Sequence, residues 1–280
     1  MKRILVPIDF SATSEKAFRF AFLLACKNKG SVTLYHVPDQ VDSPFIDDAA
    51  RRKAYNLQQA EVVVNRMHKL REKVCGATKG VPVSAVLGKQ PVVKSIIRFA
   101  EENHYDLIVM GTQGATGIKQ VVVGSVAARI AEQTTVPVLL VPARYRLAEP
   151  QRVVFAADPE RASLPHFQTL LRLVKPFIAG VEVVRLVKKT DDAAPLQAAD
   201  ANLQQLVKTL KKELRYRALT HKVVPCTDLV YQMEHLNKTV KYDLLTMVRR
   251  QKNLLERFTL KSFTKNMAYV TTRPLLVLPE

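Results

Sequence analysis

The 280-residue sequence has no tryptophan, only three cysteines, and no apolar run near the roughly 18 residues of a membrane span. The cysteines, Cys26, Cys75 and Cys226, show neither metal nor redox spacing. We expect them to be reduced core thiols of a cytoplasmic protein. A strand-like segment at residues 3–6 starts almost at once, so no signal peptide is expected.

Acidic residues are also scarce, since 25 Asp and Glu stand against 43 Lys and Arg, for a net charge of +18. Such an excess favours anionic partners, among them nucleotide phosphates and nucleic acid. The cations mostly follow expected helices, and few aromatic residues lie between them, so a solvated basic surface is the favoured interpretation. The 48% hydrophobic content indicates a globular chain of about two domains.

The two halves of the sequence are related by an internal repeat. Residues 152–158 (RVVFAAD) match residues 3–9 (RILVPID) at an offset of 149. Two later matches, of residues 242–247 with 105–110 and of 271–279 with 134–142, share an offset of 137. We therefore infer a duplication with domains at 1–145 and 150–280. The second copy has lost 12 residues (149 − 137), which we expect in the loop after its second strand.

Expected strands and helices alternate along each copy. Apolar strands at residues 3–9, 31–37 and 81–87 alternate with amphipathic helices at 15–29, 49–73 and 91–103. This alternation is typical of an α/β fold with a parallel sheet covered by helices on both faces.

The stretch at 106–142 carries the chemistry of the first copy. A buried strand ends at Gly111, Gly114 follows after two residues and Gly124 after nine more, with Ser125 next. Glycines permit positive φ and close approach to a ligand, and Ser125 is placed to cap the next helix, whose N-terminus favours an anion. Neither a Walker loop nor a GxGxxG fingerprint is present. The stretch indicates a phosphate cradle, although glycines that serve turns alone are an alternative.

This pattern, Gly-x2-Gly-x9-Gly-Ser between strands DLIVMG and PVLLVP, resembles the ATP-binding type of universal stress protein. The resemblance implies two tandem Rossmann-like domains, of the adenine nucleotide alpha hydrolase-like kind, each with a five-stranded parallel sheet of order 3-2-1-4-5. Ligands of such sheets bind where the strand order reverses, here between strands one and four. The nucleotide-binding residues that the resemblance implies are Pro7, Ile8, Asp9, Val37, Met110, Gly111, Gln113, Gly114, Gly124, Ser125 and Val126.

Within that set, the resemblance places Asp9 near the ribose or adenine, and Val37 against the adenine through its backbone. The glycines, Gln113, Ser125 and the N–H of Val126 would hold the phosphates. Asp9 has an equally weighted alternative as a cap of the next helix, because its counterpart Asp158 persists in the second copy.

The second copy departs from the glycine motif. At the offset of 137, Val248, Gln251 and Lys261 stand where the first copy has glycines, while Ser262 is kept. We predict that this site has lost its nucleotide. The basic run at 249–265 is either a solvated helix surface, which is favoured, or an anion contact.

The function that follows is ATP binding, with or without Mg²⁺, in a stress-response or signalling module. Asp9 is the only acidic candidate near the cradle, so hydrolysis should be slow at most. The alternatives are a nucleotide-free interaction scaffold and a nucleic-acid-binding regulator that uses the basic second domain. In the family that the chain resembles, domains pair through their last strands, so the resemblance implies that residues 138–141 and 275–278 pair within the chain; their apolar, uncharged edges suit this. A homo-oligomer and an unknown protein partner are further expectations, and no membrane partner is expected.

Overall fold

The structure is a computed structural model that describes residues 1–39, 49–76, 80–112, 124–157, 163–188, 192–226, 240–249 and 273–280. The first half contains β1 (Arg3–Pro7), α1 (Ala12–Asn28), β2 (Ser31–His36), α2 (Ala49–Cys75), β3 (Val83–Leu87), α3 (Val92–Glu102), β4 (Leu107–Gly111), α4 (Ser125–Gln133) and β5 (Val138–Val141). The second half contains β6 (Arg152–Ala156), α5 (Leu164–Val174), the 3₁₀ turn η1 (Lys175–Phe177), β7 (Gly180–Lys188), α6 (Ala194–Leu214), β8 (Leu219–Cys226), β9 (Leu244–Val248) and β10 (Leu275–Leu278).

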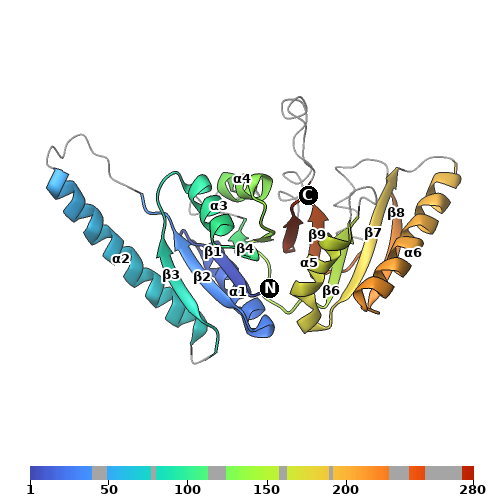
Figure 1. The fold of residues 1–280 in the computed structure, drawn as a ribbon, viewed down its shortest axis with the longest axis horizontal. Coiled ribbons are helices and arrows are strands. Elements are labelled where there is room, and N and C mark those ends of the chain that lie inside the picture. The colour runs from blue at the N-terminus through green and yellow to red at the C-terminus, as the bar shows by residue number, and fades with distance from the viewer. Residues whose placement is uncertain are drawn as a thin grey trace.

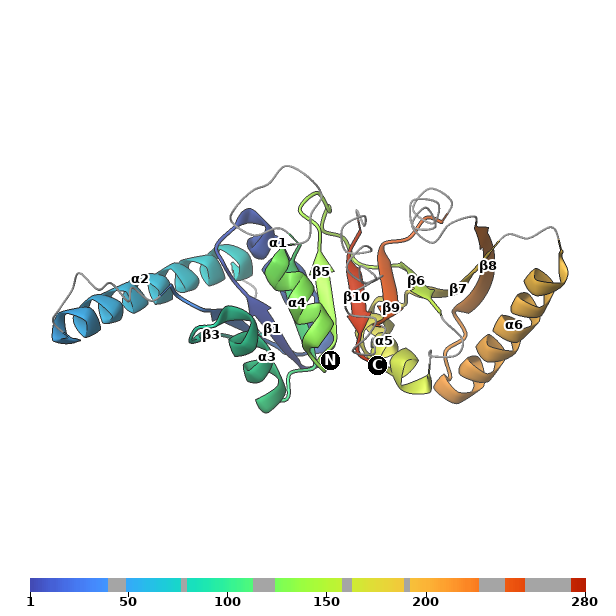
Figure 2. The same cartoon turned by 90° about the horizontal axis from the view of Figure 1, so that it is seen from above.

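All ten strands belong to one sheet of order β3-β2-β1-β4-β5-β10-β9-β6-β7-β8. Within each half the neighbouring strands are parallel and follow the predicted order 3-2-1-4-5. The halves meet where β5 and β10 pair antiparallel, so the expected pairing of the last strands is confirmed (Figures 1 and 2).

Two hydrophobic cores lie on opposite faces of this sheet, and each runs through both halves. One contains the buried side chains of α1, α5 and α6, and the other those of α3 and α4. The central strands are covered on both faces and are apolar at successive positions, as Ile4, Leu5 and Val6 of β1 are. The outer strand β3 has exposed positions, at Ser84 and Ala85.

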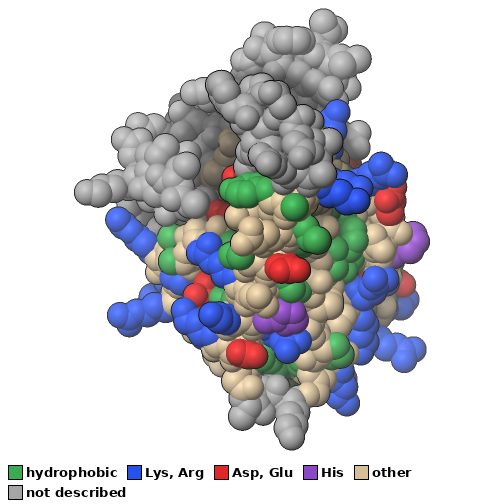
Figure 3. Space-filling view, turned by 90° about the vertical axis from the view of Figure 1, so that its left-hand side faces the viewer, with side chains coloured by type: hydrophobic (Ala, Val, Ile, Leu, Met, Phe, Trp, Pro, Cys, Tyr) green, Lys and Arg blue, Asp and Glu red, His purple; other side chains and the backbone are tan. Residues whose placement is uncertain are grey.

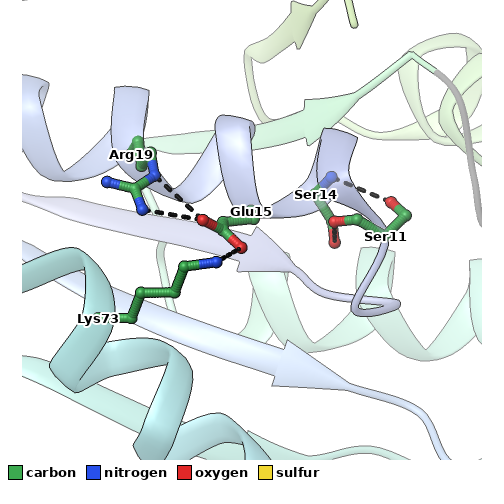
Figure 4. A network of polar contacts seen from close by, with 5 residues as sticks. All are labelled: Ser11, Ser14, Glu15, Arg19 and Lys73. Carbon is green, nitrogen blue, oxygen red and sulfur yellow. Dashed lines mark hydrogen bonds and ion pairs between the residues drawn. The ribbon is translucent and has the colours of Figure 1, made fainter.

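The start of α1 is fixed by its own polar residues. Ser11 is the N-cap, and its hydroxyl accepts a hydrogen bond from the N–H of Ser14 at 3.1 Å. Glu15 then pairs with Arg19 on the same helix at 2.8 Å and with Lys73 of α2 at 2.7 Å (Figure 4). The carboxylate therefore ties the first turn of α1 to the last turn of α2.

Two expectations were wrong in part. Of the cysteines, Cys26 is exposed and Cys75 is partly buried, so Cys26 is not a core thiol, while the placement of Cys226 remains a prediction. The shortening of the second copy is divided between the loop and the helix after its second strand, because α6 has 21 residues where α2 has 27.

We predict that Glu15→Gln lowers stability at neutral pH by a few tenths to about 1 kcal/mol, the range of exposed ion pairs. Hydrogen bonds from Lys73 and Arg19 lower the pKa of Glu15. The ionised side chain therefore stabilises the fold above its unfolded pKa, and this contribution is lost as the pH falls through the folded pKa. Urea unfolding of both proteins should show the full difference at pH 7, and the difference should shrink as the pH falls through the lowered, folded pKa of Glu15. Glu102→Gln, which removes a more exposed pair with Arg98, is the control.

A second prediction concerns Thr246 in the middle of β9. The residue is fully buried, and its hydroxyl has no hydrogen-bond partner. Its counterpart in the first half is Val109 of β4, which is also fully buried. Because an unpaired buried hydroxyl costs about 1–3 kcal/mol, Thr246→Val should raise the free energy of unfolding by about 1 kcal/mol or more. The reverse change, Val109→Thr, should lower it, and a less stable Thr246→Val protein would contradict the interpretation.

Candidate functional site

The candidate site lies where β1 and β4 end side by side at the carboxyl edge of the sheet. Pro7 and Ile8 are buried at the end of β1, and the next residue, Asp9, is exposed. The Oδ1 atom of Asp9 accepts a hydrogen bond from the N–H of Ser11 at 3.0 Å. The helix cap itself is Ser11, so Asp9 braces the turn before α1 and still presents its carboxylate at the surface.

Gly111 ends β4 directly beneath the first turn of α1. A Cβ atom on Gly111 would lie 2.6 Å from Cγ2 of Thr13 and 2.9 Å from the Thr13 carbonyl carbon. The residue is therefore needed for close packing of helix on strand. Neither Gly111 nor Gly124 has a positive φ, so of the two properties that glycine offers here, positive φ and close approach, these two residues do not use the first.

The N-terminus of α4 forms the other side of the site. Gly124 is the N-cap, with φ −54° and ψ 144°, and its N–H donates to the carbonyl oxygen of Thr112. Ser125 is the first helical residue and makes no side-chain cap, so its predicted capping role was wrong by one position. Ser125 is exposed, and Val126 is partly buried behind it. The first turn of α4, whose N–H groups have no acceptor within the helix itself, therefore starts at an exposed residue.

Several predicted residues fall outside the described chain. Gln113 and Gly114 of the first copy do so, as does Asp158 of the second. Their roles remain predictions, as does the loss of the second cradle, since 251–265 is also outside.

A cluster beside the end of β1 was missed by sequence reasoning. The Nδ1 atom of His36 lies 2.6 Å from the carbonyl oxygen of Ile8, and the His36 ring lies 4.9 Å from that of Phe10. The guanidinium of Arg66, from α2, lies 4.2 Å from the centre of the Phe10 ring. His36 precedes Val37, the residue expected to meet the adenine, but Phe10 packs against the core beneath α1 whereas Val37 packs against the core on the other face of the sheet.

The other end of α4 is held from two sides. The carboxylate of Glu101 accepts hydrogen bonds from the N–H and hydroxyl of Thr135 and from the hydroxyl of Thr134, at 2.8–3.1 Å. From the second half, Nη1 of Arg249 donates to the carbonyl oxygens of Thr134 at 2.8 Å and Ala131 at 3.3 Å.

Arg249 is only 7% exposed, although it opens the basic run that was expected to be solvated. Burial lowers its pKa, while the carboxylates of Glu280, Glu132 and Glu101 act to raise it. For this one residue the expectation of a solvated surface was wrong.

Comparison with known proteins decides the family. A model of the universal stress protein family matches residues 1–142, half of the chain. The chain belongs to the universal stress protein family. A universal stress protein of Methanocaldococcus jannaschii is 30% identical over 145 residues, which cover 50% of this chain and 81% of the relative.

Solved structures extend the likeness to the second half as a fold. A universal stress protein from Archaeoglobus fulgidus has a TM-score of 0.67 at 18% identity and covers 99% of this chain and 96% of its own. The tandem architecture of two universal-stress-protein-like halves is thereby confirmed. A universal stress protein solved in complex with cAMP matches 50% of this chain and 96% of its own at 24% identity, with a TM-score of 0.37.

The part of the chain that the structure describes holds no group of three or more His, Cys, Asp or Glu residues arranged to bind a metal ion. None of its helices is long and apolar enough to span a bilayer.

We predict that Gly111→Ala destabilises the protein by about 1–3 kcal/mol, the usual cost of overpacking. The added methyl group would press against Thr13, and thermal and urea unfolding measure the loss. Thr13→Ala in the same protein should recover part of it, because Cγ2 is removed while the backbone contact stays. The second copy has a larger residue in place of Gly111 and a smaller one in place of Thr13. Val248 corresponds to Gly111, and Ala162 corresponds to Thr13. Additive effects of the two substitutions would contradict the contact.

Proposed function

We propose that the first half of this universal stress protein binds ATP, with or without Mg²⁺, and acts as a nucleotide-dependent module in stress response or signalling. The observation that carries the proposal is the meeting of three features at one edge. They are the exposed carboxylate of Asp9, the end of β4 at Gly111, and the start of α4 at Gly124 and Ser125.

The chemistry of this edge suits a nucleotide. Free N–H groups and the dipole at the start of α4 favour phosphate oxygens, and a carboxylate at the end of β1 suits a ribose hydroxyl. Gly124 presents no side chain, so a phosphate can come close to its backbone. Val37 would border the base.

The same residues give little support for rapid hydrolysis. Fast phosphoryl transfer requires a positioned water, a base and metal ligands. The first carboxylate after β1 is that of Asp9, and its Oδ1 atom already accepts a hydrogen bond from the N–H of Ser11. Tight binding with slow turnover at most is the proposed behaviour.

A nucleic-acid-binding role is the weaker alternative. Figure 3 faces the first half, where Lys and Arg side chains are spread among acidic, apolar and histidine side chains without forming a continuous stripe. Most of the basic run of the second half, residues 250–265, lies outside the described residues. Phosphate-backbone binding normally requires clustered cations on one face. An interaction scaffold that holds no nucleotide is the other alternative.

The deciding experiment measures the nucleotide content of purified protein by denaturation, chromatography and mass spectrometry. We expect adenine nucleotide at about one per chain, or a thermal shift when Mg-ATP is added, because ligands that bind the folded state raise its stability. No nucleotide and no shift would refute the proposal and favour the scaffold.

A substitution at Gly124 locates the site. Its φ and ψ suit any residue, so Gly124→Val should fold normally, yet its side chain should block the approach of a phosphate. We expect the dissociation constant for ATP to rise at least about tenfold, equal to about 1.4 kcal/mol. The matched control is Gly180→Ala at the start of β7, where the nearest atom to a new Cβ would lie 3.9 Å away. Unchanged affinity in the Gly124→Val protein would place the nucleotide elsewhere.

A further inference from the structure

A buried arginine from the second half holds the helix that starts the proposed phosphate site in the first half. Helix α4 has nine residues, so its two ends are about 13 Å apart. Its N-terminus carries Gly124 and Ser125, and its C-terminal carbonyl groups accept hydrogen bonds from Arg249. Figure 2 shows α4 next to β5, with β5 between it and β10 of the second half.

The position of Arg249 in the repeat shows how this contact arose. At the offset of 137, Arg249 is the counterpart of Thr112, and both follow the fourth strand of their half. Their backbones make equivalent hydrogen bonds to the last strand of their half. The N–H of Thr112 donates to the carbonyl oxygen of Val141, and the N–H of Arg249 donates to the carbonyl oxygen of Leu278. Their side chains differ, because Thr112 is small and buried within its own half whereas Arg249 reaches across to α4.

The contact is strong enough to fix a helix. Hydrogen bonds from a charged donor to carbonyl oxygens are stronger than hydrogen bonds between neutral groups. A cation near a helix C-terminus is also stabilised by the helix dipole. Glu101 of α3 holds the following residues, Thr134 and Thr135, from the other side. The buried face of α4 is made largely of alanine (Ala127, Ala128 and Ala131, with Ile130). Small side chains interlock little, so the polar contacts at the C-terminus set much of the position of the helix.

We propose that Arg249 is a positioning residue for the nucleotide site: by holding the C-terminal end of α4, it sets where the N-terminal amides meet the phosphates. This inference rests on the proposed function. According to this inference, the second half, in which the glycines of the motif are replaced, contributes to the nucleotide affinity of the first half. The effect should fall on the phosphate groups and spare the nucleoside, because α4 lies on the phosphate side of the site.

The test compares full-length wild type with Arg249→Met and Arg249→Lys, and with Arg98→Met as the matched control. Arg98 is an exposed arginine of α3 that pairs with Glu102 and touches neither end of α4 in the contacts described. Calorimetry gives dissociation constants for ATP and for adenosine, which has no phosphate. Hydrogen exchange of residues 127–134 in the nucleotide-free proteins reports on the helix itself.

We expect Arg249→Met to raise the dissociation constant for ATP about fivefold or more and that for adenosine less than about twofold. Hydrogen exchange in α4 should become faster. Arg249→Lys should recover part of the ATP affinity, and Arg98→Met should match wild type. If Arg249→Met does not fold, Arg249→Gln takes its place, since its shorter amide cannot bridge both carbonyl groups.

The inference is overturned if the affinity of the Arg249→Met protein for ATP is unchanged. It is also overturned if the affinities for ATP and adenosine fall equally, because the substitution would then have disturbed the whole site and not the phosphate contacts alone. Unchanged exchange in α4 would also overturn it. A wild-type protein that binds neither ligand is a different failure: it refutes the proposed function and this inference with it, whatever the exchange data show.

Discussion

The pairing of β5 with β10 is the contact on which the rest of the molecule depends. Three apolar residue pairs join the strands, Leu140 with Leu275, Leu139 with Leu276 and Val138 with Val277. Each half is a parallel sheet that would otherwise end in an exposed apolar edge. Joining the edges makes both cores continuous across the halves, and it brings Arg249 within reach of α4.

The two halves share a fold but have diverged at the same edge. In the first, Gly111 lets α1 pack closely on β4, and the N–H of Gly124 donates a hydrogen bond to the carbonyl oxygen of Thr112. In the second, a valine ends the equivalent strand and an arginine follows it. That edge has gained a contact with its neighbour in place of a glycine motif. The asymmetry agrees with the two proposals above, in which the first half binds a nucleotide and Arg249 of the second half holds helix α4 of the first half in place.

The strands themselves could be predicted from sequence because buried parallel strands are continuous apolar runs, and the repeat placed them twice. Their order and the join between the halves were expected from the resemblance to the family, because apolar runs alone do not fix which strands are neighbours. The site could be predicted only in part. Ser125 was assigned as a cap because sequence does not fix a helix start to one residue. The packing role of Gly111 depends on Thr13, almost a hundred positions away. Arg249 lies in a basic run, and its buried partners at Ala131 and Thr134 leave no local signal.

The covalent join changes how the two copies can evolve. In a symmetric dimer of identical chains, every substitution appears on both sides of the axis and must suit both environments. Here each position occurs once, so Arg249 does not require an arginine at the corresponding position in the first half. That position holds Thr112, directly after Gly111. The linkage also holds the two copies at a constant ratio of one to one and at a high effective concentration, independent of dilution. A single gene product thus behaves as a heterodimer that does not have to find its partner.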